Sequence, residues 1–271
     1  MIQFPEKFDP VLISLGPVSV HWYGLMYVIG FIGFLLLGKM RAKRPNSTLT
    51  PDQVDDMMFY GALGVVLGGR IGYVLFYNFD AFLADPIMLF KTNQGGMSFH
   101  GGLLGVLTAA LLIARKYNKT FLQIGDFIAP MVPIGLGAGR FGNFINQELW
   151  GKPTDVSWGV IFPKAGDGLA RHPSQLYEAL LEGVVLFIIL WVYSRKPRPV
   201  GMVSGLFLLG YGVFRSFVEL FRLPDAHVGY LAFGWVTEGQ LLSLPMIIAG
   251  AIMLYWSAKK GNPPPKKGKT V

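Results

Sequence analysis

VVLFIILWVYSRKPR, residues 184–198, joins ten apolar residues directly to a basic cluster. Together with the residues before it, this run forms a segment over 175–193, close to the roughly 20 residues that cross a bilayer. The whole chain has the same character, with 271 residues, of which 52% are hydrophobic and 15% charged. A soluble domain carries roughly 25% charged residues. So little charge cannot cover a soluble surface of this size, and the sequence predicts an integral membrane protein.

Six further apolar segments have a similar length, so the predicted fold is all-α, a polytopic membrane helical bundle of about seven transmembrane helices. The seven segments are 18–38, 57–77, 98–114, 124–145, 175–193, 202–221 and 235–256. Basic clusters follow the first, third, fifth and seventh segments and hold more than half of the 24 Lys and Arg residues. The positive-inside rule places these segment ends in the cytoplasm. The N-terminus is therefore expected outside and the C-terminus inside.

The domain prediction is a single membrane domain over residues 1–271. A small outward-facing head is expected from 146–173 with 78–96, and a basic cytoplasmic tail over 259–271, in which Pro263 to Pro265 indicate an extended, disordered end. The net charge of +8 is spread over short clusters at segment ends, which argues against nucleic acid as a partner. Cysteine is absent and the four histidines lie on separate segments, so no metal and no cofactor are expected.

Charged residues inside the apolar segments indicate where function resides. An arginine at the bilayer centre costs roughly 2.5–3.5 kcal/mol, so Arg70, Arg140 and Arg215 are expected to face the bundle interior. Several polar residues share helix faces: Tyr211, Arg215, Glu219 and Arg222 on one, Gln175, Glu178 and Glu182 on another, and Arg70, Tyr73 and Tyr77 on a third. Two alternatives stay open, that Arg215 and Glu219 form a structural pair, and that the two segment-five glutamates are hydrogen-bond anchors. Glycines 64, 68 and 72 predict close helix packing.

Two glycine-rich stretches frame the expected site. Arg140 has no acidic residue three or four positions away, so its partner is expected to be a phosphate or carboxylate from elsewhere. Asn143 lies one turn further and also donates to phosphate oxygens, while the glycines at 135, 137, 139 and 142 are predicted to loosen this helix. His100 follows Gly95 and Gly96 at the start of a segment, where free amides favour an anion. A structural histidine is the alternative there.

At these motifs the sequence resembles the prolipoprotein diacylglyceryl transferase family of bacterial inner membranes. The matching stretches cover nearly the whole chain in order: HWYG (21–24), GGRIGY (68–73), MSFHGG (97–102), GRFGNFINQELWG (139–151), RHPSQLYE (171–178) and GYGVFRSFVE (210–219). The run over 139–151 is the most specific of them. The loop between Gly151 and Arg171 is shorter than in some members, which affects the expected head and not the chemistry.

The resemblance implies a transferase for the first step of lipoprotein maturation. A diacylglyceryl group passes from phosphatidylglycerol to the lipobox cysteine of a preprolipoprotein signal peptide, glycerol phosphate leaves, and a thioether forms. The enzyme is expected to be a multi-pass protein of the bacterial cytoplasmic (inner) membrane, with its site toward the periplasm. The chain's lack of cysteine fits a nucleophile that belongs to the substrate.

Site roles are expected as follows. Arg140 and Arg215 clamp the lipid phosphate, His100 accepts the thiol proton, and Glu148 orients His100 or an arginine, with a direct base role for Glu148 as the alternative. Substrate binding is expected of Arg140, Asn143, Tyr23, Arg70, Tyr211, Glu178, Glu219 and Arg222. Two other classes remain as alternatives, a transporter of an anionic solute and a scaffold that binds lipid. Neither makes a covalent product.

Overall fold

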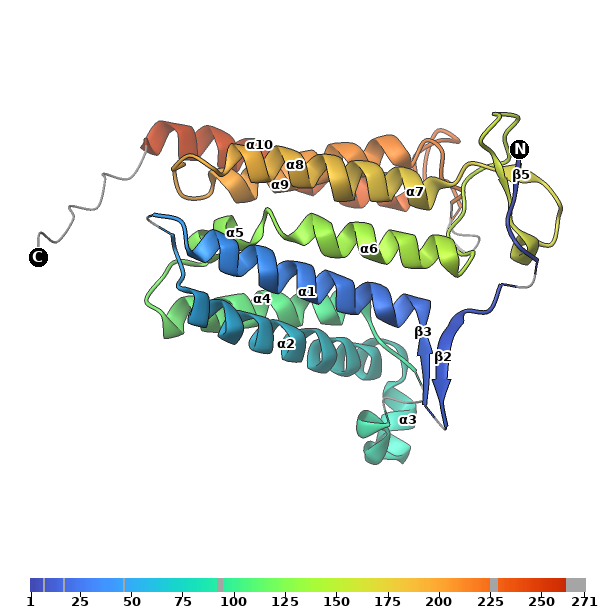
Figure 1. Ribbon diagram of the computed structural model, residues 1–271, viewed down its shortest axis with the longest axis horizontal. Coiled ribbons are helices and arrows are strands. Elements are labelled where there is room, and N and C mark those ends of the chain that lie inside the picture. Colours follow the sequence, from blue (N-terminus) through green and yellow to red (C-terminus); the bar gives the residue numbers. More distant parts are fainter. Residues whose placement is uncertain (7, 17, 46, 92–94, 225–228, 262–271) are drawn as a thin grey trace, which may run out of the picture. The chain divides into compact units, whose positions relative to one another are not determined.

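The computed structural model describes all residues except 7, 17, 46, 92–94, 225–228 and 262–271. The protein is mostly helical and divides into two compact units (Figure 1). One unit comprises Met1–Leu36 with Ile128–Val271, and the other is Leu37–Phe127. Most of the predicted basic tail, with Pro263 to Pro265, lies outside the described residues.

About half of the second unit is a pair of closely packed helices, α2 (Pro51–Tyr77) and α4 (Phe99–Lys116). Thr50 begins α2 with a capping box, in which its hydroxyl accepts from Gln53 N while the Gln53 side chain accepts from Thr50 N. The predicted glycine stripe is confirmed, because Gly64, Gly68 and Gly72 lie against the backbone of α4. Short helices α3 (Phe79–Ala84) and η1 (Pro86–Phe90) follow α2, and α5 (Phe121–Ile128) follows α4.

The first unit holds the remaining helices. After α1 (Trp22–Ala42), whose last turns enter the second unit, come α6 (Val132–Ile145), α7 (Ser174–Glu178), the π-helical stretch η4 (Ala179–Val185), α8 (Leu186–Tyr193), α9 (Met202–Val218) and α10 (Glu238–Lys260). Helices α9 and α10 pack against each other along their length (Figure 1). Small residues allow this contact, since Gly205 and Gly212 of α9 lie against the α10 backbone.

Short strands lie in the non-helical part of this unit. Strands β1 (Ile2–Gln3), β4 (Val160–Ile161) and β5 (Ala170–Arg171) form a sheet in the order β1-β4-β5, with η3 (Pro163–Ala165) between the last two. The β1–β4 pair is parallel and the β4–β5 pair antiparallel. An aromatic cluster of Phe4, Phe144, Trp150 and Phe162 fixes this sheet to the end of α6. Strands β2 (Val11–Leu15) and β3 (Val18–His21) form an antiparallel hairpin.

Each of the seven predicted segments coincides with helix over most of its length. The structure differs from the prediction in the start of the first segment, the place of the break in the fourth and the length of the sixth. The first begins at Trp22, not Val18, because Val18–His21 pairs with β2. Helix α6 runs unbroken through its glycines, and the chain bends earlier, at 129–131 beside Pro130. Among the described residues, five helices are long and apolar enough to cross a membrane, or six if α5 and α6 count as one span, and α9 is a shorter apolar helix of 17 residues.

Candidate functional site

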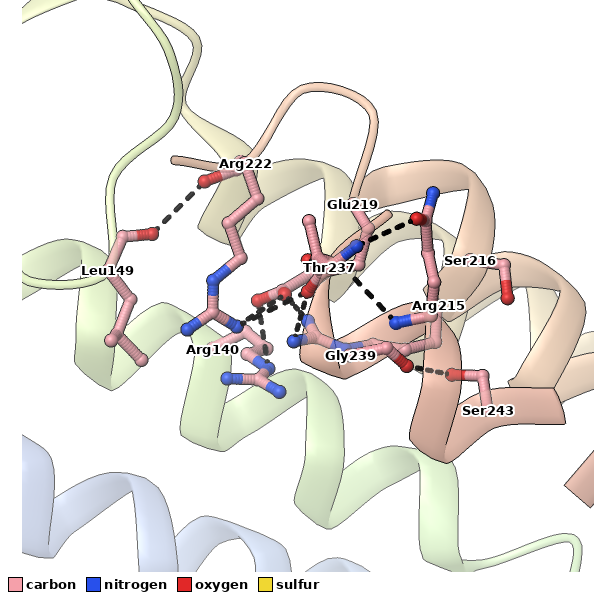
Figure 2. Close-up of polar contacts among 12 residues, drawn as sticks. Arg140, Leu149, Arg215, Ser216, Glu219, Arg222, Thr237, Gly239 and Ser243 are labelled. Atoms are coloured by element: carbon pink, nitrogen blue, oxygen red, sulfur yellow. Dashed lines mark hydrogen bonds and ion pairs between the residues drawn. The ribbon is translucent and has the colours of Figure 1, made fainter. Parts of the chain in front are cut away.

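Glu178, the last residue of α7, is the centre of a buried ion-pair cluster in the first unit. Its side chain is 1% exposed. Arg215 of α9 donates to its Oε1. Arg140 Nε of α6 lies 3.0 Å from its Oε2, which makes an ion pair, but the N–H bond does not point at this oxygen well enough for a hydrogen bond. Arg222 Nη1 lies 3.6 Å from Oε1. Figure 2 shows the three arginines converging on this site, Arg140 from α6, Arg215 from α9 and Arg222 from the turn directly after α9.

Glu219 is the second carboxylate of the cluster. It pairs with Arg215 and lies 3.8 Å from Arg222 Nη1. Thr237, the N-cap of α10, donates from Oγ1 to Glu219 Oε2 at 2.7 Å and accepts from Gln240 N at 3.2 Å (Figure 2). A methyl group at Gly239 would lie 2.5 Å from Glu219 Oε1, so glycine is needed there. The start of α10 is therefore built around this carboxylate.

The ion pairs join three guanidinium groups to two carboxylates, and Glu182 adds a third buried carboxyl group beside them, so positive charge is in excess only while Glu182 is protonated. Glu182 lies one turn after Glu178 in η4 and is 0% exposed. Within the described part of the chain, neither of its carboxyl oxygens has a hydrogen-bond partner. π-Helical stretches are rare and occur frequently at functional sites. An excess of buried positive charge suits an anionic ligand.

Asn143 and Glu148 lie at the end of α6, one turn from Arg140. Asn143 Nδ2 donates to Glu148 Oε1 at 2.7 Å, and Arg140 Nη1 lies 3.4 Å from Asn143 Oδ1. Tyr23, in the first turn of α1, packs its ring against Gly142, where a methyl group would lie 2.6 Å from the ring. An amide, a carboxylate, a guanidinium group and a phenol therefore lie beside one another at this end of α6.

Arg70 and His100 belong to the second unit. Arg70 is 5% exposed, and its guanidinium donates to five main-chain carbonyls, those of Met88, Leu89, Lys91, Gly95 and Gly96. A guanidinium has five N–H groups, so all of them are used in holding the segment after α3. His100 is exposed in the first turn of α4, where Ser98 caps the helix by accepting from Gly101 N at 3.2 Å.

The structure brings together most of the residues that sequence analysis proposed, namely Tyr23, Arg140, Asn143, Glu148, Glu178, Arg215, Glu219 and Arg222. Tyr211 lies one turn before Arg215 and stacks on Phe207, with a ring-centroid distance of 5.9 Å. The partner that sequence analysis expected for Arg140 from elsewhere in the chain or from a ligand is, within the protein, the carboxylate of Glu178, which reaches it from another helix.

Sequence analysis missed Thr237, although Thr237 and Gln240 have the spacing of a capping box directly before an apolar segment. It also assigned no role to Ser174 or Gln175, whose side chains donate to the backbone of the turn that carries Glu148. Among the described residues, no group of three or more His, Cys, Asp or Glu side chains is placed to hold a metal ion.

Comparison with known proteins gives one consistent result. The family model described as "Prolipoprotein diacylglyceryl transferase" matches residues 10–256. This chain is also similar, over almost its whole length, to proteins named phosphatidylglycerol–prolipoprotein diacylglyceryl transferase. The protein from Marinomonas sp. (strain MWYL1) is 62% identical over 251 residues, 93% of each chain. That from Pseudoalteromonas atlantica is 62% identical over 262 residues, 96% of this chain and 92% of the relative.

A third relative, from Pseudomonas aeruginosa, is 54% identical over 266 residues, 98% of this chain and 99% of the relative. These matches contain all the site residues described above, from Tyr23 to Gly239, within residues 10–256 of the family model. The buried arginine cluster, the helices long enough to span a membrane and the end-to-end similarity lead to the same conclusion: the chain belongs to the prolipoprotein diacylglyceryl transferase family.

Proposed function

We propose that this protein transfers the diacylglyceryl group of phosphatidylglycerol to the lipobox cysteine thiol of a preprolipoprotein. The new bond joins the cysteine sulfur to the glyceryl carbon, and the bond between that carbon and its phosphate oxygen breaks. Glycerol phosphate leaves as a phosphate monoester. In the overall reaction, this leaving group takes up the proton that the thiol loses. The observation that carries this proposal is the family match over residues 10–256, which includes the buried three-arginine cluster.

The arginine cluster stabilises the negative charge that develops during the reaction. As the carbon–oxygen bond breaks, negative charge grows on the departing phosphate. Arg140 and Arg215 stabilise that charge, and removal of one such donor in a desolvated site typically costs about 10²–10³ in rate. Glu178 and Glu219 hold the guanidinium groups in place before substrate arrives. The positive charge of the cluster, which is in excess while Glu182 is protonated, is then available to the lipid phosphate.

The neighbouring polar residues orient the substrates. Asn143 and Tyr23 bind the glycerol portion beside Arg140, and Glu219, Arg222, Tyr211 and Glu178 complete the binding site. His100 takes the thiol proton, because a thiol with a pKa of about 8.5 is mostly neutral at physiological pH. Glu148, which accepts from Asn143, orients this base or an arginine, and a direct base role for Glu148 is the alternative. Arg70 contributes indirectly, by holding the segment that precedes His100.

The same proposal includes a membrane arrangement. Seven helices cross the bacterial cytoplasmic (inner) membrane, with α9 and the bent α5–α6 pair each counted as one span. The N-terminus faces outward and the C-terminus inward, and residues 146–173 with 78–96 form a head on the periplasmic side of a single membrane domain. The basic clusters after alternate segments support this orientation.

A direct assay tests the function. Purified protein is incubated with phosphatidylglycerol and a lipobox peptide, and the mass of the peptide is measured by mass spectrometry. The expected product is heavier by one diacylglyceryl group. Arg140→Ala, purified from membranes at a comparable yield, is expected to give no product, and full activity of this variant would refute the phosphate clamp. Movement of an anionic solute across vesicles without any modified peptide would instead favour a transporter.

A further inference from the structure

The turn that carries Glu148 has an unfavourable backbone conformation on both sides of this residue. Gln147 and Leu149 adopt positive φ angles of 53° and 57°, in the left-handed region that non-glycine residues rarely occupy. Leu149 is a bulky residue in that region. Such strain persists only where surrounding structure imposes it, and it gathers at functional sites. The question is therefore which contacts impose it here.

Two adjacent side chains at the start of α7 hold this turn. Gln175 Nε2 donates to Glu148 O at 2.6 Å, and Ser174 Oγ donates to Leu149 O at 3.0 Å. Both side chains are 0% exposed. A carbonyl oxygen only accepts, so the amide nitrogen of Gln175 must be the atom that faces Glu148.

The backbone after the turn is fixed by the same region of the chain. Gly151 N donates to His172 O at 2.9 Å, and His172 N donates to Lys152 O at 3.0 Å. A methyl group at Gly151 would lie 2.5 Å from His172 O, so the two segments are in contact. With Ser174 and Gln175, the segment over 172–175 thus contacts the run from Glu148 to Lys152, and Phe221 O holds the end of that run by accepting from Lys152 N at 2.9 Å.

The contacts of α7 connect two acidic residues of the site. Glu148 is held through its backbone by Gln175, and Glu178 lies one turn after Gln175 on the same helix, where it pairs with Arg140 and Arg215. The held conformation brings Glu148 Oε1 within 2.7 Å of Asn143 Nδ2. Glu148 N also donates to Asn143 O at 3.0 Å, so Gln175 fixes the carbonyl side of a residue whose N–H side is already tied to Asn143. Without the donor of Gln175, the peptide group after Glu148 can rotate to an ordinary conformation, which turns the carboxylate away from Asn143 Nδ2.

We propose that Gln175 is a positioning residue for the transfer reaction, which acts by imposing the strained turn that aims the Glu148 carboxylate at Asn143. This inference rests on the proposed function. Ser174 supports the same turn from the neighbouring carbonyl.

The test is a double-mutant cycle on purified protein in the transferase assay. Gln175→Leu keeps the side chain's approximate size and removes the donor, and it is expected to lower kcat on the order of ten-fold with little change in KM for phosphatidylglycerol. In a Glu148→Gln background, where the carboxylate is already gone, Gln175→Leu is expected to cost nothing further. Equal, multiplicative losses in both backgrounds would show a general structural role and overturn the proposal.

A rescue variant separates positioning from stability. Leu149→Gly removes the side-chain penalty of the left-handed conformation, so it is expected to restore much of the activity of Gln175→Leu. No rescue by Leu149→Gly would count against the strained-turn mechanism. The matched control is Ser257→Ala, which removes a buried hydroxyl that donates to Val200 O at 2.9 Å, a bond of the same kind far from Glu148 in sequence, and leaves activity unchanged.

Two further outcomes are distinguishable. If Gln175→Leu does not accumulate as folded protein, Ser174→Ala replaces it in the same cycle, with a smaller loss of kcat that again disappears beside Glu148→Gln. If the wild-type protein makes no diacylglyceryl peptide, the proposed function fails. If the wild-type protein is active and both α7 variants keep full kcat, only the positioning role fails.

Discussion

Glu178 shows what a single buried carboxylate does at the residue scale. It is paired with Arg140 and Arg215 and lies 3.6 Å from Arg222 Nη1. Removing one partner of a buried ion pair typically costs about 3–5 kcal/mol, because the other charge stays buried without compensation. Sequence spacing did not identify this partner of Arg140, since an i±3 or i±4 search sees only one helix. Pairs between helices become visible only once the fold is known.

The first prediction concerns this residue. Glu178→Gln keeps the shape and removes the charge, and it is expected to lower the free energy of unfolding by about 3–5 kcal/mol. Chemical denaturation in detergent measures the change. Asp85→Asn is the matched control, since its ion pair with Lys91, at 2.8 Å, is exposed. An exposed pair contributes about 0–1 kcal/mol, so equal losses in the two variants would contradict the role of burial.

At the scale of elements, sequence located the helices well and the strands poorly. Apolar runs of bilayer length are a strong signal, and every predicted segment is helical in its central part. Val18–His21 alternates apolar and polar residues, as a strand does, but it is only four residues long and directly precedes the apolar run, so it was counted with the helix and its pairing with Val11–Leu15 was missed. The three-stranded sheet consists of strands of two residues each, too short for a periodic pattern.

The glycine stripe gives a prediction for the α2–α4 pair. A Cβ atom at Gly68 would lie 2.9 Å from Gly105 Cα, so Gly68→Val forces the two backbones apart. Overpacking of this kind costs about 1–3 kcal/mol. Gly61→Val, in the same helix with no atom within 4 Å of its Cβ position, is the control. The thermal midpoint in detergent should fall for Gly68→Val and stay close to wild type for Gly61→Val. Equal midpoints would show that the helices separate without cost.

The link between β5 and α7 should be sensitive to acid. Trp158 Nε1 donates to Tyr177 Oη at 2.8 Å, and Tyr177 Oη lies 3.1 Å from His172 Nδ1, where a neutral imidazole accepts its proton. Burial, and to a lesser degree the charge of Lys152, lower the pKa of His172 below its ordinary value of 6.5. The unfolded chain therefore binds this proton more readily than the folded protein does.

The contribution of neutral His172 to the free energy of unfolding is therefore fully present above pH 6.5, and it is lost as the pH falls through the lowered pKa. Unfolding curves from pH 8 to about pH 4.5 for wild type and His172→Gln measure this, because the difference between the two curves isolates the one imidazole. We expect the wild type to lose more stability than the variant on acidification. Parallel curves would mean that His172 is equally easy to protonate in both states.

At the scale of the whole molecule, membrane orientation depends on where Lys and Arg lie and not on net charge. Some basic residues after the first and third segments are paired with acids, as in Lys39–Asp55 at 2.7 Å and Lys116–Asp56 at 2.5 Å. These pairs lower the net charge of that end and leave the count of basic residues unchanged. The proposed orientation therefore remains N-terminus out and C-terminus in, and it can be tested without reference to activity.

Because the chain contains no cysteine, single-cysteine variants report orientation without background. Asp80→Cys and Asp155→Cys replace exposed residues of the proposed head, and Lys119→Cys and Lys196→Cys lie at proposed cytoplasmic ends. A membrane-impermeant maleimide added to intact spheroplasts should label the first two variants at once and the last two only after permeabilisation. The inverse pattern would reverse the topology. Labelling of Lys119→Cys and Lys196→Cys on opposite sides would show that the segments between them cross the membrane an odd number of times, which excludes the two spans proposed there.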